Sequence, residues 1–132
     1  MALKDSLNPW APKILSIMRI MSGLIFLAHG TGKHLGFPML PYEVPAGSPG
    51  WYAGWIELVT GILIALGLFT RPAAFLASGT MAVAYFMAHA SQNFFPVLNG
   101  GDAAILYCFV FLYFVFRGPG PWSVDAKMGK DS

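Results

Sequence analysis

The 132-residue sequence has few charged side chains and a single cysteine. Charged residues make up only 11% of the chain, whereas a soluble domain carries roughly a quarter. Hydrophobic residues make up 56% and aromatic residues 15%, and a soluble domain of this length could not bury so much apolar surface. This composition excludes an ordinary soluble domain and a disordered chain. It predicts a protein that lies in a lipid bilayer.

The lone thiol and the small net charge exclude further classes of protein. Cys108 has no second cysteine with which to form an intrachain disulfide, a Cys-x-x-Cys redox pair or a cysteine-based zinc site. The formal net charge is +2 and the basic residues are scattered, so no nucleic-acid partner is expected. The N-terminus lacks the pattern of a cleavable signal, so we expect the first apolar run to be retained as a helix.

Four apolar segments predict four membrane-spanning helices in a single domain over residues 1–132. Each contains about 16 to 18 residues, near the short end of the range that crosses a bilayer. Lipid offers the backbone no hydrogen-bond partners, so each span should be helical throughout. The predicted spans are residues 14–30, 52–69, 73–90 and 102–117.

The connections between these segments differ in length. Residues 70–72 alone separate the second and third spans, so these two helices should form a tight hairpin. Long, proline-containing connections cover residues 31–51 and 91–101. Lysine and arginine are concentrated on the opposite side, which predicts cytoplasmic termini and outward-facing long connections. The sequence thus predicts an all-α, membrane-embedded four-helix bundle with long outer connections after helices 1 and 3.

Ionisable residues inside the spans suggest a polar pocket. Each costs at least about 2.5–3.5 kcal/mol at mid-membrane, and each shares a helical face with small or polar neighbours. Helical rise places most of them in the outer half of the bundle. The candidate outer pocket consists of Glu57, His29, His89, Asp102 and Lys33. Arg19 and Arg71 are predicted as inner-side charges or members of a structural ion pair.

Each candidate also has a structural interpretation. Arg19 could extend to cytoplasmic phosphates or form an inward ion pair. Asp102 could cap the fourth helix, and His29 and His89 could be interfacial residues with satisfied hydrogen bonds. Glu57 should either pair with a cation or stay protonated.

Several short motifs, in order along almost the whole chain, resemble a known family. They are Arg19, Gly23-Leu24-Ile25-Phe26, His29-Gly30, Lys33, Gly54-Trp55-Ile56-Glu57, Gly61, residues 67–74, Ala88-His89, Phe95-Pro96, Asn99-Gly100-Gly101-Asp102 and residues 118–125. In this combination the sequence resembles the DoxX family of small bacterial membrane proteins. The resemblance implies a four-helix, multi-pass protein of the bacterial plasma (inner) membrane, related to the small subunit of thiosulfate:quinone oxidoreductase.

The resemblance and the polar pocket together lead to several functional hypotheses. The first is an accessory or quinone-interacting subunit of a membrane redox system, in which a partner subunit carries the electron donor. The alternatives are a small-solute carrier and a non-catalytic membrane scaffold. A metal or haem held by His29 and His89 is disfavoured, because their spacing matches no ligand motif, and no metal site is expected. Besides lipid, we expect a second copy of the chain or a redox subunit as partner.

Overall fold

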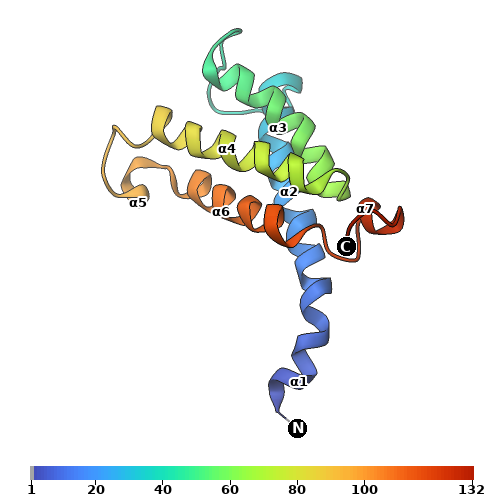
Figure 1. Ribbon diagram of the computed structural model, residues 1–132. Helices are drawn as coiled ribbons and strands as arrows, with labels where there is room; N and C mark the ends of the chain where they lie inside the picture. Colours follow the sequence, from blue (N-terminus) through green and yellow to red (C-terminus); the bar gives the residue numbers. More distant parts are fainter. Residues whose placement is uncertain (1) are drawn as a thin grey trace.

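The computed structural model describes residues 2–132, and these residues form helices and connections without any strand (Figure 1). The elements are α1 (Leu3–Leu7), the 3₁₀ turn η1 (Asn8–Trp10), α2 (Ala11–Leu35), α3 (Pro49–Leu66), α4 (Thr70–Ala88), α5 (Pro96–Asn99), α6 (Asp102–Arg117) and α7 (Val124–Lys127). The all-α prediction is confirmed. Helices α2, α3, α4 and α6 correspond to the four apolar segments.

Local sequence signals set the ends of these helices. Helix α3 begins at Pro49, and the Ser48 hydroxyl accepts a hydrogen bond from the Trp51 N–H at 3.3 Å. Gly36 ends α2 and Gly67 ends α3, each with a φ of 71° that favours glycine. The tight connection is residues 67–69 rather than 70–72, because α4 already begins at Thr70.

Helices α2 and α3 approach each other closely through glycine. A methyl group on Gly23 would lie 2.6 Å from the backbone nitrogen of Ala65, and one on Gly30 would lie 2.5 Å from that of Leu58. Gly61 makes the reciprocal approach from α3 to α2. Any larger residue would force the backbones apart. Small residues act in this way where membrane helices pack closely, and here they lie on the faces that the sequence shows around Arg19 and Glu57.

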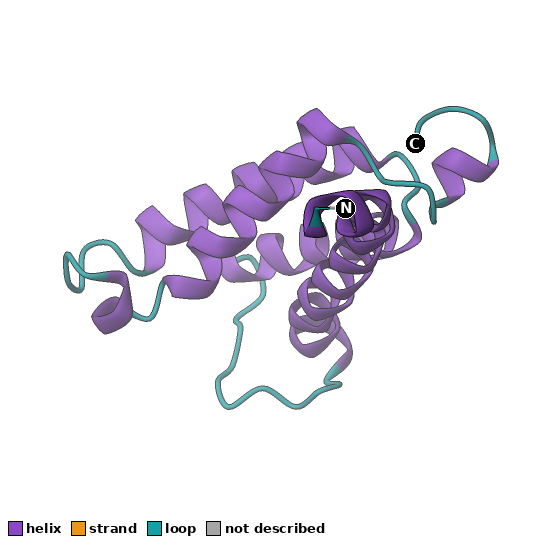
Figure 2. Ribbon diagram, turned by 90° about the horizontal axis from the view of Figure 1, so that it is seen from below, coloured by secondary structure: helices purple, strands orange, loops and turns teal. Residues whose placement is uncertain are grey.

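The four long helices form two pairs. Helix α2 packs mainly against α3 and α4 mainly against α6, while α3 and α4 join the pairs. The α4–α6 pair runs across the direction of α2, which is seen almost end-on in Figure 2. The first part of α2, with α1, projects beyond the other helices (Figure 1). The arrangement is therefore two crossing helix pairs, α2–α3 and α4–α6, rather than four nearly parallel helices.

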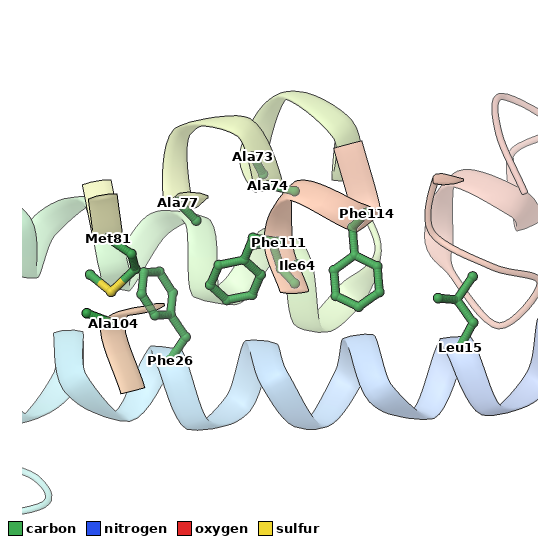
Figure 3. Packing of buried hydrophobic residues seen from close by; sticks show 10 residues of the cluster. All are labelled: Leu15, Phe26, Ile64, Ala73, Ala74, Ala77, Met81, Ala104, Phe111 and Phe114. Carbon is green, nitrogen blue, oxygen red and sulfur yellow. The ribbon is translucent and has the colours of Figure 1, made fainter. Parts of the chain in front are cut away.

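A narrow apolar core fills the space between the pairs. In Figure 3 the core side chains are spread along α2, with Leu15 near one end and Phe26 near the other. Phe26, Ile64, Phe111 and Phe114 are fully buried. The outer faces of the same helices, in contrast, expose many large apolar side chains. Two stretches, Leu3–Leu35 and Pro49–Leu66, are long and apolar enough to cross a membrane, judged by length and composition.

Candidate functional site

A buried ion pair joins α2 to α3. The Lys33 ammonium donates to Glu57 Oε1 at 2.7 Å, and the Glu57 side chain is only 3% exposed. Gly54, one turn before Glu57, makes room for this end of α2, because a methyl group there would lie 3.1 Å from Lys33 Cβ. Of the two states expected for Glu57, the structure therefore has the one paired with a cation.

The ion pair lies at the wall of a cavity of about 960 Å³. Helices α3 and α4 form most of the wall, with contributions from the last turns of α2, the start of α6 and the connection before α3. Four of the five predicted pocket residues line it, namely Glu57, His29, His89 and Lys33. Most of the remaining lining is apolar. The cavity thus combines a hydrocarbon-like wall with a small number of ionisable groups, as ligand sites commonly do.

The two histidines face the cavity in different settings. The His29 ring packs edge-on against Tyr107 of α6, with 5.9 Å between the ring centroids. His89 Nδ1 lies 2.9 Å from the carbonyl oxygen of Asn99. Because a carbonyl only accepts, Nδ1 carries the hydrogen, and Nε2 becomes the ring atom that can serve a ligand. The Asn99 amide also donates to the Tyr85 hydroxyl at 3.0 Å, which fixes the loop that holds His89.

Asp102 does not join this group. It is exposed in the first turn of α6 and does not line the cavity, and its carboxylate there complements the helix dipole. The N-cap residue of α6 is Gly101 rather than Asp102. Tyr107 and Glu43, by contrast, line the cavity although the sequence did not single them out for it. Within residues 2–132, no three or more His, Cys, Asp and Glu side chains are grouped as a metal site.

Arg19 forms a second polar cluster, away from the cavity. Its side chain is 1% exposed and donates from Nε to the Ile64 carbonyl at 2.9 Å. Its two terminal nitrogens donate to the carbonyls of Pro119 and Trp122, the latter at 2.7 Å. Arg19 therefore does not extend to the surface, and it forms no side-chain ion pair within residues 2–132. It binds backbone oxygens of the C-terminal segment and the end of α3.

The C-terminal segment is held at further points. The Asp125 carboxylate accepts hydrogen bonds from the backbone N–H groups of Phe69 and Thr70, both at 3.0 Å, and so caps α4. Asp131 pairs with Arg71 at 2.6 Å, and this hydrogen bond holds the pKa of the Asp131 carboxyl below its usual range. Arg71, which the sequence predicts to be an inner-side charge or a member of a structural ion pair, thus pairs with Asp131.

The chain is similar in sequence to known proteins. The DoxX family model matches residues 14–90, which is more than half of the chain. The chain belongs to the DoxX family. An uncharacterized protein of Haemophilus influenzae is 45% identical over 132 residues, covering 96% of this chain and 98% of its own length. An uncharacterized membrane protein of Mycobacterium tuberculosis is 29% identical, covering 98% and 95%. No solved structure matches the chain significantly.

The residues matched by the DoxX model include the charged groups of the cavity but only part of the Arg19 cluster. It covers α2, α3 and α4, and therefore Arg19, the Lys33–Glu57 pair and His89. Tyr107 and two of the three residues whose carbonyls bind Arg19, Pro119 and Trp122, lie beyond the matched residues. The charged groups of the cavity thus belong to the DoxX segment, and α6 and the C-terminal segment complete the structure around them.

Proposed function

We propose that this DoxX protein is an integral protein of the bacterial plasma membrane whose cavity binds a quinone, as an accessory subunit of a membrane redox system. The observation that carries the proposal is the cavity of about 960 Å³. Its wall is largely apolar but includes the Lys33–Glu57 pair and two histidines. In this proposal all four long helices lie in the lipid, as the two crossing pairs.

The distribution of apolar side chains supports the membrane part of the proposal. Exposed Phe, Leu, Ile, Met and Val side chains occur on all four long helices. In water such a surface would drive aggregation, whereas lipid would solvate it. Arg71 bonds to the Val115 carbonyl near the end of α6 and Arg117 to the Ser132 carbonyl, so both arginines lie beside the lysine-containing C-terminal segment, which supports cytoplasmic termini.

The chemistry of the cavity supports a quinone head group. Quinone carbonyl oxygens need hydrogen-bond donors. The Lys33 ammonium can donate, and His89 Nε2 can donate when the ring is protonated, because Nδ1–H is already used by the Asn99 carbonyl. Reduction adds protons, and Glu57 and the histidines are groups that can exchange them. The electron donor would belong to a partner subunit, because the sequence has no haem, flavin or iron–sulfur motif.

The packed core weighs against the alternative of a small-solute carrier. Phe111 and Phe114 are fully buried, and in Figure 3 they lie along α2 between Ala104, which lines the cavity, and Leu15. The C-terminal segment then covers that end through its bonds to Arg19. A transported solute would have to pass both layers, so a binding site closed at one end fits the described residues better.

The test is quinone binding by the purified protein in detergent. A long-chain ubiquinone or menaquinone should bind saturably, and Glu57→Gln combined with His89→Ala should weaken binding by about tenfold or more. Asp102→Asn, outside the cavity, is the matched control and should bind like the wild type. Absence of saturable binding by the wild-type protein would refute the proposal. Solute flux into proteoliposomes that is lost in Glu57→Gln would favour a carrier instead.

A further inference from the structure

Gly79 of α4 differs from the glycines that bring α2 and α3 together. It is exposed and lines the cavity, and a methyl group on it would meet no other atom within 4 Å. Gly23 and Gly30, in contrast, each touch a neighbouring backbone. Glycine weakens a helix relative to alanine, so no local or packing requirement explains this residue. Its effect is to leave space beside the cavity.

This space interrupts a row of large apolar side chains. Residues four apart lie on one side of a helix, so Phe75, Gly79, Val83 and Met87 form a single row along α4. All four line the cavity, and the three side chains are 67%, 57% and 61% exposed. The row is therefore an apolar rim that faces the surroundings, with a gap one side chain wide at Gly79.

The cavity is polar inside and apolar at this rim. The Lys33–Glu57 pair is almost completely buried, whereas the α4 row is mostly exposed. An amphiphilic ligand fits this gradient with its polar head near the ion pair and its hydrocarbon chain toward the rim. At about 960 Å³, the cavity is near the upper end of the range for small-molecule sites, which leaves room for more than a head group.

We propose that Gly79 forms the notch through which the prenyl chain of the quinone leaves the cavity, between Phe75 and Val83, toward the lipid. The inference rests on the proposed quinone binding and adds that the ligand must carry a long hydrocarbon chain. It assigns Gly79 as a specificity-determining residue, because a larger side chain would occupy the volume that the chain needs.

The test compares quinones with and without a chain in the full-length protein in detergent. Gly79→Phe should weaken binding of a long-chain ubiquinone by about tenfold or more, while binding of the chainless dimethoxy-methyl-benzoquinone stays within about twofold. Gly79→Ala should bind both like the wild type. Val59→Phe adds an aromatic ring at an exposed α3 position that does not line the cavity, and it should also leave both affinities unchanged.

The outcomes separate this inference from the proposed function. If the wild type binds neither quinone, the proposed function fails and the inference fails with it. If the wild type binds the long-chain quinone and Gly79→Phe binds it equally well, only the role of Gly79 is refuted. Equal weakening of both quinones would also refute the notch, because the ring would then obstruct the head group. If Gly79→Phe loses a phospholipid that co-purifies with the wild type, and its quinone affinity does not change, the space at Gly79 holds a lipid acyl chain instead. That result would overturn the inference.

Discussion

Replacing Arg19 with methionine should destabilise the protein by about 2–4 kcal/mol. The substitution removes the donors for three carbonyl oxygens. The Ile64 oxygen also accepts from the Gly67 N–H at 3.1 Å, so the loss falls mainly on the Pro119 and Trp122 oxygens. Leaving a buried acceptor unsatisfied costs about 1–3 kcal/mol. The Trp122 bond is only partly buried, so water can replace part of it, and the expected total for the two oxygens stays at or below about 4 kcal/mol.

The assay is reversible unfolding in mixed detergent micelles, combined with limited proteolysis of the C-terminal segment. Arg19→Met should both lower the free energy of unfolding and expose residues 118–132 to protease. Arg19→Lys should recover only part of the stability, because an ammonium cannot reproduce the planar set of guanidinium donors. Arg117→Met is the control, since Arg117 makes an exposed bond to the Ser132 carbonyl. A loss below about 1 kcal/mol in Arg19→Met, with an unchanged protease pattern, would refute the reasoning.

Three further predictions concern stability, each measured by the same unfolding assay. Lys33→Met alone should cost about 3–5 kcal/mol because it leaves the Glu57 carboxylate buried without its cation, and adding Glu57→Leu should recover most of that; no recovery would contradict the pairing. Gly23→Ala should cost about 1–3 kcal/mol, since its methyl group would lie 2.6 Å from a backbone nitrogen of α3, and a neutral effect would mean that the helices are not in close contact. The Arg71 hydrogen bond lowers the pKa of Asp131, so its stabilisation should be complete above the ordinary carboxyl pKa of about 4 and be lost as pH falls through the lower folded-state pKa. Wild type and Asp131→Asn should therefore differ at pH 7 and converge in acid, and a constant difference would argue against the pair.

The helices and their contact faces could be predicted from the sequence because both depend on local patterns. Apolar runs bounded by glycine and proline identified all four long helices. The small residues around Arg19 and Glu57 marked the faces that pack, and Gly23, Gly30 and Gly61 do lie at the contact between α2 and α3. The crossing of the two helix pairs was not predictable in this way. It depends on side-chain packing between segments far apart in the sequence.

The candidate site was predicted only in part, for a related reason. Helical rise places His29, Lys33, Glu57 and His89 in the outer half of the bundle, and all four line one cavity in the structure. Depth does not determine direction around the helix axis, so Asp102 was included although its side chain is exposed. No periodic pattern could have indicated that Arg19 binds the C-terminal segment, because its acceptors there, the Pro119 and Trp122 carbonyls, are 100 and 103 residues away.

The two charged clusters differ in how far their hydrogen-bonding groups are already used, and this difference indicates which one can bind a ligand. All three nitrogens of the Arg19 guanidinium donate to carbonyls, and the side chain is buried under the C-terminal segment. In the other cluster, the bond to Glu57 Oε1 uses one of the three ammonium hydrogens of Lys33, and both residues line the cavity. A ligand at the Arg19 cluster would have to displace the C-terminal segment, whereas one at the Lys33–Glu57 pair would add to existing bonds. Substitution of Arg19 should therefore reduce stability first, and substitution of Glu57 should reduce binding even where the fold is retained.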